Sequence, residues 1–70
     1  METMLINAGI RNLKEFGYPD VDSKNILVDY VYSQFFLSML KETLEKYSGQ
    51  KDVVVACERL INKIEKKRTT

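Results

Sequence analysis

Hydrophobic residues recur at helical spacing in three segments of the chain, which two breaks separate. In residues 3–16, the apolar side chains that share one face of a helix are Leu5, Ile6, Ile10, Leu13 and Phe16. In residues 52–67, the corresponding set is Val53, Ala56, Cys57, Leu60, Ile61 and Ile64. Polar residues fall on the opposite face of both segments, which is the pattern of amphipathic helices that cover a core.

The first break carries the residues of a helix end followed by a turn. Gly17 suits the left-handed residue that follows a helix, and Pro19 cannot continue that helix. Asp22 or Ser23 then offers a side-chain oxygen that can cap the next element. We therefore expect a short helical turn at residues 24–28.

The middle segment, residues 29–48, starts at Asp29, which caps a longer helix or bends the chain into it, and ends before Gly49. Its apolar residues divide into two stripes when they are placed at about 100° per residue. The first stripe consists of Phe36, Leu37, Leu40, Leu44 and Tyr47. The second stripe stops where the charged residues begin, and it consists of Val31, Tyr32, Phe35 and Met39.

The second stripe has two interpretations, and both remain open at this point. A central helix that contacts two neighbours has a broadened apolar face, so both stripes would then be core. Alternatively, the second stripe faces another chain, which the enrichment of Tyr, Phe and Met in interface cores favours. The first stripe is expected to be core in either case.

These patterns predict an all-α fold, a bundle-like single domain of three helices over residues 1–70, with the short extra turn before the central helix. Gly9 lies within the first apolar face and would let a neighbouring helix approach closely. The residues expected to form the core are Leu13, Phe16, Phe36, Leu40, Leu44, Leu60, Ile61 and Ile64.

Charge and residue usage narrow the classes of function. The chain has 11 Lys and Arg against 10 Asp and Glu, and this near-neutrality argues against strong attraction to nucleic acid or an anionic membrane. The uncharged run Tyr30–Leu40 is far shorter than the about 20 apolar residues of a membrane span, so no membrane partner is expected. The single cysteine, Cys57, fits a reducing cytoplasm. Small domains often gain stability from a disulfide, a metal ion or an oligomer contact, and oligomerisation is the one that this sequence leaves open.

No residue pattern indicates catalysis or a cofactor. The segment Asp20–Asn25 starts like a calcium loop, but Lys24 stands where a third oxygen ligand is needed, and capping explains the same residues. Cys57 has no histidine to serve as its base and lies on an apolar face, so it is expected to be a buried small side chain. We therefore predict a chain that is not an enzyme, with no metal, cofactor or small-molecule substrate.

The end of the third segment is the one basic cluster in the sequence, formed by Lys63, Lys66, Lys67 and Arg68. Cations in the last turn of a helix complement its dipole, which accounts for them without a partner. The alternative is weak, salt-sensitive contact with the phosphates of a nucleic acid. A small nucleic-acid-binding or regulatory protein is therefore the second candidate function.

From Phe16 to Leu40 the order "FGYPDV…NIL.DYVYSQFFLSML" resembles small helical proteins encoded by phages and prophages. Members of this group share the Gly-Tyr-Pro turn, the Asn-Ile-Leu segment and an aromatic helix that ends in Ser-Met-Leu. The group has no assigned activity, so the resemblance implies a phage accessory protein, located in the host cytoplasm, and transfers no site residue. The leading prediction is a non-enzymatic protein-interaction module, a homodimer that associates through Val31, Tyr32, Phe35 and Met39.

Overall fold

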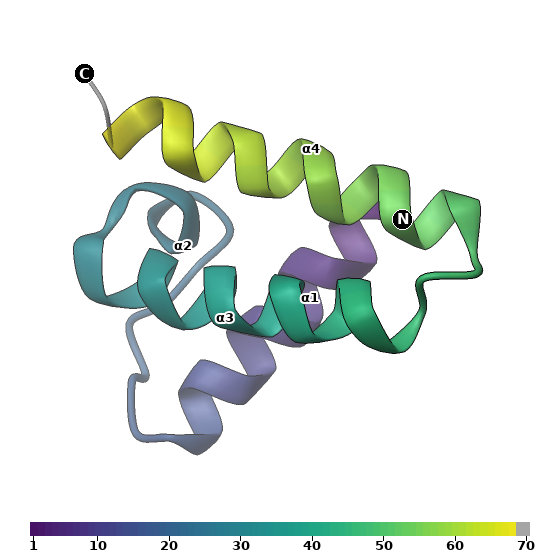
Figure 1. The fold of residues 1–70 in the computed structure, drawn as a ribbon. Helices are drawn as coiled ribbons and strands as arrows, with labels where there is room; N and C mark the ends of the chain where they lie inside the picture. The colour runs from purple at the N-terminus through teal and green to yellow at the C-terminus, as the bar shows by residue number, and fades with distance from the viewer. Residues whose placement is uncertain (69–70) are drawn as a thin grey trace.

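The computed structural model describes residues 1–68, and this part of the chain forms four α-helices and no strand (Figure 1). Their bounds are Glu2–Glu15 for α1, Asn25–Val28 for α2, Tyr30–Lys46 for α3 and Lys51–Arg68 for α4. The predicted all-α fold of three helices with a short extra turn is confirmed, with α2 as that turn.

The helix α3 is the centre of the arrangement, because the two most extensive helix contacts, with α4 and with α2, both involve it, and it also packs against α1. Figure 1 shows α4 running alongside α3 in the opposite direction and α1 crossing behind α3 at a steep angle. The molecule measures only 17 Å in its thinnest dimension. Packed helices lie about 8–10 Å apart, so this thickness holds two layers of helices and leaves part of α3 without cover.

The core contains seven side chains with less than 2% of their surface exposed, namely Phe36, Ile26, Leu40, Leu60, Ile64, Cys57 and Ser33. Leu13 is also buried, and Leu44 and Ile61 are partly buried against this core. Phe16 was expected in the core, and that prediction is wrong, because 72% of its surface is exposed. Tyr47, the last member of the first stripe, is likewise exposed, since it lies beyond the last helical residue of α3.

Gly9 sets the closest approach of α1 to α3. A Cβ atom at this position would lie 2.7 Å from Cδ1 of Phe36 and 3.0 Å from Cδ1 of Ile26. Both neighbours are fully buried and have no room to move. The expectation that Gly9 permits close helix packing is therefore confirmed.

The loop before α2 is held by a reciprocal pair of caps. Oδ1 of Asp22 accepts hydrogen bonds from the backbone N–H groups of Lys24 and Asn25, at 2.9 and 2.8 Å. Oδ1 of Asn25 accepts the backbone N–H of Asp22 at 2.8 Å. These bonds lower the pKa of the Asp22 carboxyl, and they assign the cap to Asp22 and not to Ser23.

The start of α1 is tied to α4 by charged contacts. Oε1 of Glu2 accepts a hydrogen bond from Nζ of Lys63 at 3.0 Å, and its other oxygen lies 3.8 Å from a guanidinium nitrogen of Arg59. The bond from Lys63, together with the charges of both bases, lowers the pKa of the Glu2 carboxyl. Within residues 1–68, none of the helices combines the length and apolarity that crossing a bilayer requires.

Candidate protein interaction site

Four aromatic rings from α1, α3 and the loop between them meet on the surface. The ring centroids of Phe16 and Phe35 are 5.8 Å apart, and those of Tyr18 and Phe35 are also 5.8 Å apart. Tyr18 and Tyr32 meet edge to face at 5.7 Å. Such separations are those of interacting aromatic pairs. The four rings together with Val31 and Met39 form what we call the aromatic patch.

The end of α1 places Phe16 and Tyr18 in the patch. Phe16 is the last residue with helical geometry, and Gly17 follows with φ of 101°, a left-handed conformation that glycine adopts without strain. The N–H of Tyr18 then bonds to the carbonyl of Leu13 at 3.0 Å, and that of Gly17 bonds to the carbonyl of Lys14 at 3.1 Å. This pair of bonds is the Schellman motif. It confirms the expected role of Gly17 and holds Phe16 on a rigid corner.

The start of α3 positions the other side of the patch. Oδ1 of Asp29 accepts the backbone N–H groups of Val31 and Tyr32, at 2.9 and 3.1 Å. Asp29 is therefore the N-cap that the sequence suggested. Because this cap fixes the backbone of the first turn of α3, it also fixes the position from which the side chains of Val31 and Tyr32 enter the patch.

The four residues predicted to contact a partner are brought together at the surface. Val31 and Phe35 are 45% and 42% exposed, whereas Tyr32 and Met39 are half-buried. The side-chain amide of Asn12 donates a hydrogen bond to Sδ of Met39 at 3.3 Å, which joins this end of the patch to α1. The interpretation that places the whole second stripe inside the core is wrong for Val31 and Phe35, which are exposed, whereas Tyr32 and Met39 are partly buried against the core.

A groove of about 200 Å³ runs between α1 and α3 at the edge of the patch. Its buried floor consists of Gly9, Leu13 and Phe36. Its walls are the more exposed side chains of Asn12, Phe16, Phe35, Ser38, Met39 and Glu42. An apolar floor with a few polar groups at the rim is typical of a surface that receives an apolar side chain.

Burial governs the ionisation of the tyrosine in the patch. Desolvation raises the pKa of Tyr32, and the negative charges of Asp29 and Asp20 raise it further. Tyr32 is therefore a neutral phenol at physiological pH. A neutral phenol is compatible with burial against an apolar partner, provided that its hydroxyl finds a hydrogen bond.

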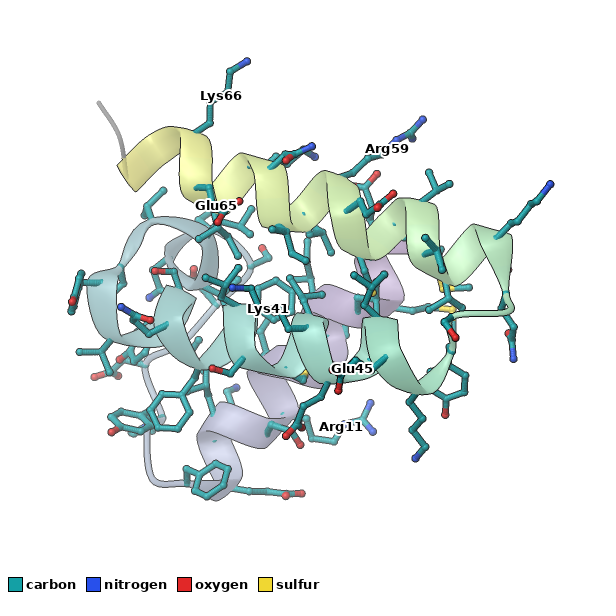
Figure 2. The ribbon with its side chains drawn as sticks, in the orientation of Figure 1. Arg11, Lys41, Glu45, Arg59, Glu65 and Lys66 are labelled. Atoms are coloured by element: carbon teal, nitrogen blue, oxygen red, sulfur yellow. The ribbon has the colours of Figure 1, made fainter. Side chains whose placement is uncertain are left out.

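The basic residues predicted as a second site are less available than the sequence suggested. Lys63 is engaged with Glu2, as described above. Lys66 is exposed and points outward from α4, as does Arg59 (Figure 2). The side chains of Lys67 and Arg68 lie outside the described part of the structure. A phosphate group would therefore have to displace a carboxylate from Lys63.

The residues considered for chemistry have structural roles. Cys57 is completely buried, and burial raises the pKa of its thiol, with the charge of Glu58 adding to the effect. A protonated, enclosed thiol is a poor nucleophile. In the segment compared with a calcium loop, Oδ1 of Asp22 and Oδ1 of Asn25 each accept backbone N–H groups.

A second hollow, of about 430 Å³, lies between the starts of α1 and α4. Two acidic and two basic side chains line it, namely Glu2, Asp52, Lys51 and Arg59. Because the two signs balance, this hollow does not select a charged ligand. The aromatic patch with its groove is therefore the better candidate site.

Sequence reasoning missed two members of the patch. Phe16 was assigned to the core, and Tyr18 was given no role. The signal that could have placed Phe16 is its position directly before Gly17, which makes it the C-cap of the helix, at the edge of the packed region. Comparison with protein-family models, curated proteins and solved structures finds no match to this chain.

Proposed function

We propose that this protein is a non-enzymatic interaction module that forms a homodimer through the aromatic patch. The observation that carries the proposal is the contact between the rings of Phe16 and Phe35, which remain 72% and 42% exposed. Each ring can bury about 150–250 Å², so the pair leaves on the order of 200 Å² of aromatic surface in water. The largest apolar patch on a typical monomer measures about 300–600 Å², so the proposal depends on the groove beside these rings as well as on the rings themselves.

A second copy of the chain is the partner that the surface favours. The patch contains a projecting group, Phe16, and a hollow, the groove, side by side, and a two-fold interface requires such self-complementarity. The net charge of +1 gives two copies almost no mutual repulsion. Each partner of a stable complex buries about 800 Å². The rings would supply only the centre of that area, so we expect weak, reversible dimerisation in the micromolar range.

Location and origin belong to the same proposal. A lone cysteine suits the reducing cytoplasm, and the resemblance to phage and prophage proteins makes this the host cytoplasm. Phage accessory proteins without catalytic residues act by binding other macromolecules, and the patch supplies a binding surface. The buried thiol of Cys57 supports a non-enzymatic role.

Solution mass measured by light scattering over a concentration series tests the proposal. The wild-type protein is expected to rise from 8.2 kDa toward twice that mass as its concentration increases. Phe35→Asp places a charge in the centre of the patch and should give a folded monomer at every concentration. Val55→Asp is the matched control, because Val55 has similar exposure but lies on α4, outside the patch.

Three results would contradict the proposal. A wild-type monomer at high micromolar concentration removes the homodimer. An unfolded Phe35→Asp variant, shown by its circular dichroism, makes Phe35 a core residue. An unchanged dimer for the same variant removes the patch from the interface.

The same preparation tests the nucleic-acid alternative. That function predicts retardation of DNA or RNA at about 50 mM salt, and its loss when Lys63, Lys66, Lys67 and Arg68 are neutralised. We expect no retardation, because the exposed bases of α4 are interspersed with Glu58 and Glu65.

A further inference from the structure

We infer that, in the homodimer, each copy inserts the ring of Phe16 into the groove between α1 and α3 of the other copy. This inference rests on the proposed function and states how the same patch is used. It makes Phe16 the central anchor of the interface and the groove its receptor. The alternative geometry stacks the rings of the two copies on each other across the two-fold axis.

Phe16 has the properties of an anchor. It is the most exposed large hydrophobic side chain in the described residues, and the Schellman motif at Gly17 and Tyr18 holds its backbone. A rigid aromatic residue loses little conformational entropy when it is buried. Phe16 is therefore already arranged to enter a hollow on another surface.

The groove has the properties of a receptor for such a ring. Its floor is apolar, because it consists of Gly9, Leu13 and Phe36. Its rim carries the polar groups of Asn12, Ser38 and Glu42, which can keep contact with water when the floor is covered. An apolar centre inside a polar rim is the usual construction of a protein interface.

The symmetry of a dimer makes the insertion reciprocal. Phe16 lines its own groove, so the anchor and the receptor are parts of one surface. A two-fold axis that brings Phe16 of one copy into the groove of the other necessarily does the same for the second pair. A single association step then buries both exposed anchors and fills both grooves. Stacking of the rings along the two-fold axis would leave the grooves empty.

A complementation experiment separates these two geometries. Phe16→Ala removes the anchor and one wall of the groove but keeps the floor of the receptor, whereas Ser38→Trp fills the groove and keeps the anchor. Each variant alone is expected to dimerise more weakly than wild type by roughly thirtyfold, the cost of losing a major contact. Mixed in equal amounts, they should form a heterodimer in which one intact anchor meets one open groove, so the mixture associates more tightly than either variant alone.

Two matched variants control for nonspecific effects. Tyr47→Ala removes an exposed aromatic ring outside the patch, and Glu45→Trp adds a bulky ring to an exposed position of α3 that does not line the groove (Figure 2). Both should dimerise like wild type. Because Phe16, Ser38 and both control positions are exposed, circular dichroism should show folded protein in every case.

The outcomes distinguish the two levels of the proposal. If wild type does not dimerise, the homodimer and the insertion both fail. If wild type dimerises and Phe35→Asp abolishes it, but the mixture of Phe16→Ala and Ser38→Trp gains nothing over its components, the homodimer stands and reciprocal insertion is overturned. Recovery of association in the mixture supports insertion.

Discussion

Phe35 and Phe36 are adjacent in the chain and lie in the same helix, yet they end in different environments. Phe36 is 1% exposed and lies against Gly9 of α1, whereas Phe35 remains 42% exposed in ring contact with Phe16 and Tyr18. The two side chains are chemically identical. The difference therefore shows that the placement of neighbouring helices, and not hydrophobicity, decides which face of α3 becomes core.

The cause lies in the path of α1. Where α1 carries Gly9 it approaches α3 closely and covers Phe36, but α1 ends at Glu15, and the chain turns away at Gly17. Two helical layers fill the 17 Å thickness of the molecule, so within the described residues no third helical layer lies over Phe35, which stays 42% exposed. Val31 and Phe35 of the second stripe are consequently left exposed, whereas Tyr32 and Met39 are partly buried against the core.

The largest effect should come from truncating the two phenylalanines in turn. Phe36→Ala leaves a cavity in the core and should cost about 3–5 kcal/mol of unfolding free energy. That is a large share of the about 3.5–10 kcal/mol expected for 70 residues. Phe35→Ala removes mainly a surface ring contact and should cost about 1 kcal/mol or less.

Urea unfolding followed by circular dichroism measures both losses. The protein concentration has to stay below the range in which dimers form, because association would add to the apparent stability. Equal losses for the two variants would contradict the division of α3 into a buried and an exposed face.

A smaller effect is expected from adding one methyl group between α1 and α3. Gly9→Ala puts a Cβ atom 2.7 Å from the buried ring of Phe36. Overpacking costs about 1–3 kcal/mol, which exceeds the gain of up to about 1 kcal/mol from better helix propensity. We expect net destabilisation by about 1–2 kcal/mol in the same urea assay.

Gly49→Ala is the matched control for that substitution. A Cβ atom at Gly49 meets nothing within 4 Å, and its φ is not in the left-handed region. Removing a glycine at a compatible position stabilises by about 0.4–1 kcal/mol. A stabilised Gly9→Ala variant would show that α1 and α3 are not tightly packed at this point.

The smallest effect should come from acid, which acts on neither face of α3 but on the loop between α1 and α2. The pKa of Asp22 is lowered from its ordinary 3.8 by two backbone N–H groups, so its contribution to stability is complete above that pH. This contribution is lost as the pH falls below 3.8 and passes through the lowered pKa of the folded protein. Unfolding by urea at pH 5 and at pH 2.5 should show lower stability in acid, and Asp22→Ala should reduce the difference.

The local elements of this protein could be predicted because they depend on nearby residues. The cap at Asp29 and the turn at Gly17 are made by hydrogen bonds to residues at most five positions away. The first apolar stripe was also recognisable, since Phe36, Leu37 and Leu40 repeat at the helical period. Burial was harder to infer: the core includes a polar residue, Ser33, whose hydroxyl donates a hydrogen bond to the carbonyl of Tyr30.

By itself, the sequence determined that the chain is helical, where its helices begin and end to within about two residues, and that four residues of α3 form a second apolar stripe. Only the tertiary structure decided that Val31 and Phe35 of this stripe stay exposed, that Phe16 joins them, and that a groove opens beside them. The physical reason is the distance along the chain over which each kind of interaction acts. Caps and helical periodicity act within a few residues, whereas exposure depends on how α1 crosses α3 and on where it stops.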